Sequence, residues 1–285
     1  MGLPVAQLKG IPIEVIILGS GSPLVVPDRA GPSTLVRIGK VDLLFDCGRA
    51  VLMRGAAVGM TARDLTALFV THMHSDHTTD YNDVITTRWI TSQDSRPLLA
   101  YGPLGFKRFT EATLNMLDTD VHYRMSHHAD LQHKPQVQAH EIAEGLVYES
   151  AGLRVIAAAT DHSPVHPTMG FRVEAEGKVV VIAGDTVPCE GLNRLCQGAD
   201  AYIQTVVRRA PIAQHPMQRF REVLDYHSDI EQAAKTAANA GVRVLVLNHP
   251  VPPPQPGTEP QWIAEAKAHF DGEVLLATDL LRIEA

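Results

Sequence analysis

A chain of 285 residues with 45% apolar and 20% charged side chains has the composition of a globular protein, and one of this length buries about 75% of its unfolded surface. The net charge of −7 excludes a general attraction to polyanions, so tight nucleic-acid binding would need a local basic patch. No stretch approaches the roughly 18 apolar residues of a membrane span, and residues 1–10 lack the features of a signal peptide. We therefore expect a single domain over residues 1–285 in the cytoplasm, with no membrane partner.

Apolar runs typical of buried strands end repeatedly at a polar residue. Because α/β folds place their sites at the carboxyl ends of strands, these polar residues are candidates for a common site. The runs and the residues that follow them are 13–18 before Gly19 to Ser22, 41–45 before Asp46, 68–70 before His72, 155–159 before His162, 178–183 before Asp185, and 242–247 before His249.

Helices are predicted between some of these strands. Ser228 and Glu231 form the pattern of a capping box, an alanine-rich stretch follows over 230–240, and Gly241 supplies the end of that helix. Two further helices are predicted over 103–117 and 259–270, the first after a strand at 97–101. The polar segment at about 118–140 has no clean period, so we predict an excursion or a lid there. Its five histidines are His122, His127, His128, His133 and His140.

Residues 72–77 carry the strongest chemical signal in the chain. In an extended segment His72 and His74 point the same way, and Asp76 and His77 in the following turn face a second point nearby. Imidazole and carboxylate ligands suit zinc and would also serve iron or manganese. Four ligands cannot complete two coordination spheres, and the strand-end candidates for the remainder are His162, Asp185 and His249.

These motifs resemble those of the metallo-β-lactamase superfamily, which they match in order over nearly the whole chain. The resemblance implies an α/β fold, a four-layer αββα sandwich of two βαβα halves. It also implies two metal ions, most simply two Zn²⁺ per chain, with Mn²⁺ or Fe²⁺ as alternatives. One ion would be held by His72, His74 and His162 and the other by Asp76, His77 and His249, with Asp185 as a bridge and Asp46 as a supporting residue.

Details within the motifs narrow the resemblance. An aspartate at position 185, followed by Thr186, is similar to ribonuclease Z, phosphodiesterases and the aryl sulfatases of this fold. His227 matches the histidine that faces the scissile group in ribonuclease Z-like enzymes. The basic arm with which ribonuclease Z grips tRNA has no equivalent in the sequence, since Arg124 and Lys134 are the only fixed positive charges in 118–140. This difference puts tRNA processing in doubt.

Two metals lower the pKa of a shared water, so a bridging hydroxide is the expected nucleophile. Asp76 would orient it, and His227 would supply a proton to the leaving oxygen. We expect a hydrolase of a small phosphodiester or sulfate ester, with a small-molecule partner rather than nucleic acid. The alternatives are a lactone or carboxylic-ester hydrolase, a ribonuclease Z-like RNA endonuclease and, from a different class, a di-iron redox protein. By analogy with relatives, we also expect a homodimer.

Other residues carry weaker signals. Cys47, Cys189 and Cys196 form no Cys-x-x-Cys pair, and they are expected to be small buried side chains in a reducing compartment. His166 is either a pocket residue or a surface residue, and the surface is favoured. The turn from Gly19 to Ser22 lacks the lysine of a phosphate-binding loop, so a tight structural turn is expected there.

Overall fold

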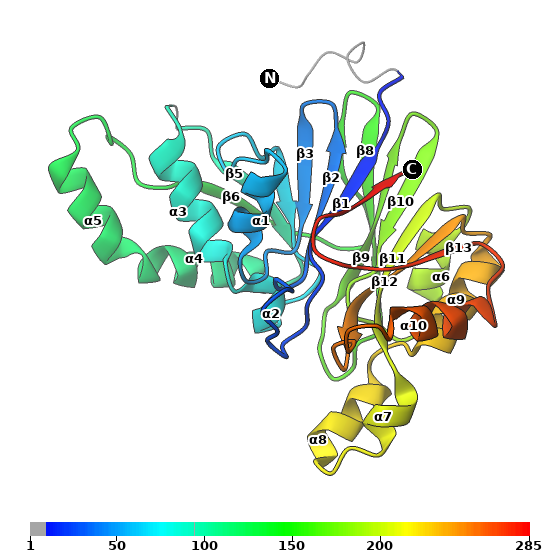
Figure 1. The fold of residues 1–285 in the computed structure, drawn as a ribbon. Helices are drawn as coiled ribbons and strands as arrows, with labels where there is room; N and C mark the ends of the chain where they lie inside the picture. The colour runs from blue at the N-terminus through cyan, green and yellow to red at the C-terminus, as the bar shows by residue number, and fades with distance from the viewer. Residues whose placement is uncertain (1–9, 94) are drawn as a thin grey trace.

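The computed structural model describes residues 10–93 and 95–285, and its framework is two seven-stranded sheets packed face to face (Figure 1). The first sheet has the order β14-β1-β2-β3-β4-β5-β6, and the second β13-β12-β11-β10-β9-β8-β7. The strands of the first sheet are β1 (Glu14–Gly19), β2 (Ser33–Ile38), β3 (Val41–Phe45), β4 (Ala67–Phe69), β5 (Leu98–Gly102), β6 (Val137–Glu141) and β14 (Leu281–Glu284). Those of the second are β7 (Gly145–Ser150), β8 (Leu153–Ala159), β9 (Met169–Ala175), β10 (Lys178–Ile182), β11 (Ala201–Val207), β12 (Val244–Val251) and β13 (Glu273–Leu276).

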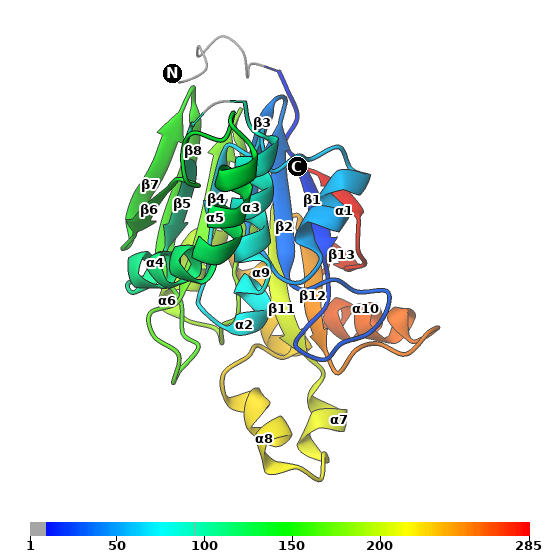
Figure 2. The same cartoon turned by 90° about the vertical axis from the view of Figure 1, so that its left-hand side faces the viewer.

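Helices cover the outer face of each sheet, so the layers run helix, sheet, sheet, helix (Figures 1 and 2). The expected αββα sandwich is therefore confirmed. On the first half lie α1 (Val51–Ala57), α2 (Ser75–Thr78), α3 (Tyr81–Thr91), α4 (Phe106–Met116) and α5 (Asp118–His127). On the second lie α6 (Glu190–Cys196), α7 (Arg209–Ala213), α8 (Gln218–Arg221), the 3-10 turn η2 (Glu222–Asp225), α9 (Ile230–Ala240) and α10 (Glu259–Lys267).

Aromatic rings fill the space between the two sheets. Phe45 stacks on Phe69 with ring centroids 5.0 Å apart, and Phe171 of the opposite sheet lies 5.6 Å from Phe69. All three side chains are buried, and the residues between them on each strand face the outer helices instead. This dry inner layer fixes the two sheets against each other and thereby fixes the distance between their strand ends.

Four parallel strands run side by side in each sheet, β3 to β6 in the first and β10 to β13 in the second. Their carboxyl ends meet at one edge of the sandwich. Six of the predicted strands are present close to the predicted bounds, and the residue that follows each of them, or ends it, lies at that edge. The strand predicted at 97–101 is also present, as β5, whereas the sequence pattern did not single out β2, β6, β7, β9, β11, β13 or β14.

The helix at 230–240 has the predicted bounds but not the predicted cap. Asp229 is the N-cap, since its carboxylate accepts from the backbone N–H of Gln232 at 2.8 Å and the Gln232 side chain accepts from the Asp229 N–H at 3.0 Å. The hydroxyl of Ser228 instead donates to the carbonyl of Thr186 at 2.8 Å. The predicted capping pair Ser228 and Glu231 is thus wrong by one residue, and the tertiary contact to Thr186 explains why.

Regular structure occupies much of the segment 118–140. The helix α5 covers its first ten residues, and β6 begins at Val137. In Figure 1, α5 lies on the far side of α3 and α4 from the second sheet. No helix among residues 10–93 and 95–285 is long and apolar enough to cross a membrane. The three cysteines are free; Cys47 and Cys196 are buried as expected, whereas Cys189 is half-buried and caps α6.

Candidate metal centre

The residues of the 72–77 motif converge as the sequence predicts. His72 and His74 lie in the loop after β4, and the Nε2 atom of His72 is 3.0 Å from the Nδ1 atom of His74. Asp76 and His77 follow on the single turn of α2, with 3.7 Å between the Oδ2 atom of Asp76 and the Nε2 atom of His77. All four side chains therefore face the same edge of the sandwich.

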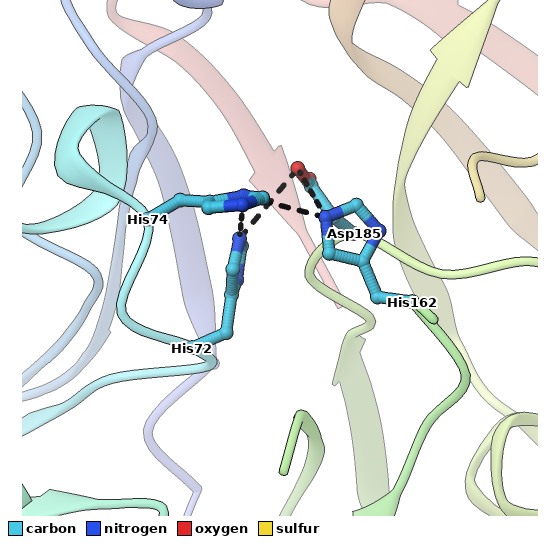
Figure 3. Close-up of side chains that lie close together, drawn as sticks. All are labelled: His72, His74, His162 and Asp185. Carbon is cyan, nitrogen blue, oxygen red and sulfur yellow. Dashed lines mark hydrogen bonds and ion pairs between the residues drawn. The ribbon is translucent and has the colours of Figure 1, made fainter. Parts of the chain in front are cut away.

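The second sheet supplies the other three predicted residues. His162 follows β8, Asp185 follows β10, and His249 lies within β12. Figure 3 shows His72, His74, His162 and Asp185 directed at one another. The residues fall into two groups that could each hold a metal ion: His72, His74, His162 and Asp185 form one, and Asp76, His77 and His249 form the other.

Asp185 stands between the two groups. Its Oδ2 atom lies 3.8 Å from the Nε2 atoms of both His72 and His162, 3.4 Å from that of His77 and 4.0 Å from that of His249. One carboxylate oxygen is thus near nitrogen atoms of both groups. This is the position that a bridging ligand would occupy.

Hydrogen bonds on the outer side of three imidazoles fix their tautomers. The carbonyl oxygen of Tyr226 accepts from His162 Nδ1 at 2.8 Å, and the carboxylate of Asp46 accepts from His77 Nδ1 at 2.8 Å. Thr71 donates its hydroxyl proton to Asp46, so its oxygen accepts from His72 Nδ1 at 3.0 Å. With the proton on Nδ1, each ring directs the lone pair of Nε2 inward, as is usual for metal-binding histidines.

Among the described residues, His74 Nδ1 is the one group placed to donate a proton to the inward nitrogen atoms of His72 and His162, and a single proton cannot serve both. Besides the short contact between His72 and His74, the Nε2 atom of His162 lies 3.4 Å from the Nδ1 atom of His74. The buried Nε2 atom of His77 has no hydrogen-bond partner among the described residues. Nitrogen lone pairs this close repel one another unless a cation lies between them, so the cluster is suited to a metal site.

The charges of His72, His162 and Asp185 agree with this interpretation. Burial opposes the protonation of His77 and His249, but nearby carboxylates, foremost Asp185, raise the pKa of both rings. Burial lowers the pKa of His72 well below its ordinary value and that of His162 to about 4, so both rings are neutral at pH 7. Burial would raise the pKa of Asp185, but the surrounding imidazoles, foremost His249 and His77, hold that pKa well below its usual range. Neutral imidazoles and an ionised carboxylate are the forms that bind metals.

Left-handed backbone conformations accompany the strand ends that carry the site. Asp46 and His249 have φ values of 58° and 49°, which non-glycine residues rarely adopt. Gly184 has a φ of 68°, and a Cβ atom there would lie 2.9 Å from the Cβ of Thr71, so only glycine fits before Asp185. Such strain persists where the surrounding packing enforces it, which is a common property of functional sites.

His227 lies beside the cluster, at the wall of a cavity. Its Nδ1 atom donates to the carbonyl of Val223 at 3.1 Å, which leaves Nε2 directed at the Oδ2 atom of Asp185, 3.2 Å away. A cavity of about 310 Å³ opens from this point and from His74, Asp76 and His249 toward the hairpin made by α7 and α8. A substrate in the cavity would therefore contact both the candidate metal-binding cluster and His227.

Three residues that position the cluster were not predicted from the sequence. Thr205 donates its hydroxyl to the Oδ1 atom of Asp185 at 2.8 Å, while Thr71 and the Tyr226 carbonyl orient histidines as described. Thr205 stands near the carboxyl end of β11, but two apolar residues follow it, so the strand-end pattern does not single it out. Tyr226 acts through its backbone, so no side-chain pattern indicates it.

The weaker candidates lie outside the cluster. His166 is exposed and contacts Ser163 at 3.0 Å, and Ser20 of the predicted tight turn is bonded to Asp279 through both its N–H and its hydroxyl. His140 is half-buried and stacks on Tyr101. The other histidines of 118–140 are exposed, namely His122, His127, His128 and His133.

Comparison with known proteins agrees with the fold and the cluster. Residues 42–249 match the family described as Beta-lactamase superfamily domain. The protein named Ribonuclease Z of Mycobacterium bovis BCG Pasteur is 48% identical over 274 residues, covering 95% of this chain and 98% of the relative. Among solved structures, the metallo-beta-lactamase fold protein YhfI of Bacillus subtilis has a TM-score of 0.74 at 22% identity, covering 96% of this chain and all of YhfI. The short form of human tRNase Z has a TM-score of 0.70 at 23% identity, covering 95% and 98%.

Proposed function

This chain belongs to the beta-lactamase superfamily and is a metal-dependent hydrolase of ester bonds, and from this premise we propose that it is a ribonuclease that hydrolyses phosphodiester bonds in RNA. The observation that carries the proposal is the similarity, over nearly the whole chain, to a protein named Ribonuclease Z. The small phosphodiester or sulfate ester favoured by the sequence has no such support. The alternative, a ribonuclease Z-like endonuclease, replaces it.

The two groups of the cluster would hold two metal ions. His72, His74 and His162 would bind one ion, and Asp76, His77 and His249 the other, with Asp185 shared between them. Nitrogen-rich ligands with carboxylates favour zinc, while manganese and iron remain alternatives that metal analysis distinguishes. Two such ions, when bound, lower the pKa of a water molecule and stabilise negative charge on phosphoryl oxygens.

The side chains around the ions would orient the water and move a proton. Asp76 has one carboxylate oxygen 3.1 Å from His249, which leaves the other free to accept a hydrogen bond from the attacking water. Water supplies the new oxygen on phosphorus, and the bond from phosphorus to the leaving oxygen breaks. His227, held at Nδ1 by the Val223 carbonyl, would take up a second proton on Nε2 and transfer it to that leaving oxygen.

The test is a comparison of turnover on purified protein of known metal content. The substrates are a folded RNA with a single-stranded 3′ extension, bis-p-nitrophenyl phosphate, p-nitrophenyl sulfate, a lactone and a carboxylic ester. We expect kcat/KM for RNA to exceed that for every small ester, and we expect cleavage at one or a few positions. Preference for the sulfate or the lactone with RNA left intact would refute the proposal. Visible absorption from bound iron without any hydrolysis would instead indicate the redox alternative.

A further inference from the structure

The hairpin of α7 and α8 projects beyond the strand ends, at the same end of the molecule as α2 (Figures 1 and 2). A small apolar cluster anchors it to the sheet: Ile212 packs with Val207 of β11 and Val251 of β12, and Val223 and Leu224 lie against them. The hairpin ends at Tyr226 and His227, both of which contact the metal-binding cluster. It is therefore a fixed wall of the site rather than a detached loop.

The wall that this hairpin presents to the cavity is apolar. Phe220 and Val223 line the cavity from the hairpin, together with Tyr226, while Pro23 and Leu24 line it from the loop after β1. Val25, next to Leu24 in the sequence, is 70% exposed, and Met217 is 37% exposed. A cavity of about 310 Å³ lies at the small end of the range for ligand sites, which is roughly 300–1,000 Å³.

Positive charge gathers on the same hairpin in a chain whose net charge is −7. Arg208 and Arg209 at its base are paired with Glu265 and Asp229, at 3.0 and 2.7 Å. Arg219 lines the cavity and is exposed. Its guanidinium stands 6.0 Å from the Phe220 ring and 3.8 Å from the sulfur of Met217, and no carboxylate among the described residues pairs with it.

An aromatic ring and a cation side by side form the usual means of holding single-stranded nucleic acid, because bases stack on the ring and phosphates pair with the cation. Here both line the same cavity as His227, the proposed donor to the leaving oxygen. Resting on the proposed ribonuclease function, we propose that Phe220 and Arg219 bind the nucleotide that carries the leaving oxygen. Phe220 stacks on its base, and Arg219 binds the phosphate on its far side.

The sequence has no basic arm in 118–140 that could bind RNA. Phe220 and Arg219 would supply RNA-binding contacts elsewhere. The residues that would bind RNA lie within 208–226, on the side of the site formed by the second sheet. They would contact the nucleotide next to the scissile phosphate. The recognition they provide depends on the presence of a base and only weakly on its identity, because every base has a stacking face.

The experiment uses full-length, metal-loaded protein and three short RNAs of equal length that contain the cleavage site. The first is intact, the second is abasic at the nucleotide that carries the leaving oxygen, and the third is abasic at the nucleotide on the other side of the scissile phosphate. Phe220→Ala, Phe220→Trp and Arg219→Ala are compared with the wild type. Tyr123→Ala and Arg124→Ala on α5 serve as controls, because they remove an exposed ring and a guanidinium far from the site.

Phe220→Ala should raise KM for the intact RNA roughly five- to a hundredfold, as expected for loss of one stacked base. The same change should have no effect on the RNA abasic on the leaving side and its full effect on the RNA abasic on the other side. Phe220→Trp should restore the wild-type KM. Arg219→Ala should reduce the slope of log affinity against log salt by about 0.7, the value for one phosphate of a single strand.

Each other outcome overturns the assignment. Equal losses of Phe220→Ala on all three RNAs would show a structural role, and losses matching those of Tyr123→Ala would show no role at the site. An unchanged salt slope for Arg219→Ala would refute the phosphate contact. Wild-type protein that carries both metals and cleaves no RNA would refute the ribonuclease function itself, and this result is distinct from an active wild type with insensitive variants.

Discussion

Replacing Asp46 by asparagine should weaken metal binding although Asp46 touches no metal. The Asp46 carboxylate accepts three hydrogen bonds. They come from His77 Nδ1 at 2.8 Å, from the Thr71 N–H at 2.8 Å and from the Thr71 hydroxyl at 2.9 Å. Asparagine has nearly the same shape but one amide oxygen and one NH₂ group. The NH₂ group must therefore face either the Thr71 N–H, a clash of two donors, or His77.

If the amide NH₂ faces His77, it donates to Nδ1 and moves the ring proton to Nε2, where the lone pair is required. If it faces Thr71, a buried N–H loses its acceptor, which costs about 1–3 kcal/mol. Loss of a hydrogen-bond partner behind a metal ligand typically lowers metal affinity about 10- to 100-fold. That range is about 1.4–2.7 kcal/mol. The first orientation therefore lowers metal affinity by this amount, whereas the second lowers the stability of the fold by a similar amount.

The assay is competition for metal between the protein and a chelator of known affinity. Asp42→Asn is the matched control: Asp42 lies on β3, the strand that Asp46 follows, and it accepts from Arg37 at 2.7 and 2.8 Å, but it is remote from the cluster. We expect the control to lower thermal stability without changing metal affinity. If Asp46→Asn folds and binds metal as tightly as the wild type, the tautomer argument is refuted.

Three further predictions concern the cluster itself. Asp185→Ala should lose metal and activity together because both groups depend on this carboxylate, and a variant that keeps two metals per chain would exclude the bridging role. His227→Ala should keep its metals while turnover falls about 10²- to 10⁴-fold, most strongly for substrates with poor leaving groups; a uniform loss across leaving groups would argue against proton donation. In the chelated protein, the lowered pKa of His162 means that the unfolded chain binds more protons than the folded one between about pH 6.5 and 4. Stability should therefore fall as the pH falls through that window, which thermal unfolding at pH 7, 5.5 and 4.5 measures.

Most residues of the cluster could be predicted from the sequence because one rule applies to the strands that carry them. Buried parallel strands are apolar on both faces, so the polar residue at the end of each strand stands out in the sequence. Asp185 and His249 were identified in this way, and the structure brings them together with His162. His162 follows the apolar run of β8, a strand that pairs antiparallel with both of its neighbours. Thr205 follows the same rule, but it is followed by two more apolar residues of β11, which hides the strand end.

Prediction failed where tertiary contacts or short elements decide the structure. Ser228 and Asp229 are both good caps, and only the contact to the Thr186 carbonyl assigns the cap to Asp229. The helices α7 and α8 have five and four residues, too few to show a helical period. The helix α5 had local signals that the histidines obscured, namely acidic residues in its first turn and an ion pair between Asp120 and Arg124.

The division of the cluster between the sheets has a thermodynamic consequence. His72 and His74 of the first group come from the first sheet, and His162 and Asp185 from the second. The other group is divided in the same way, with His249 alone on the second sheet. Each ion would therefore connect the two sheets. Without ions, repulsion between the inward lone pairs and carboxylates would weaken the contact between the sheets at this edge. Because ligand binding to the folded state stabilises it by mass action, metal binding and the docking of the two sheets would be one coupled equilibrium.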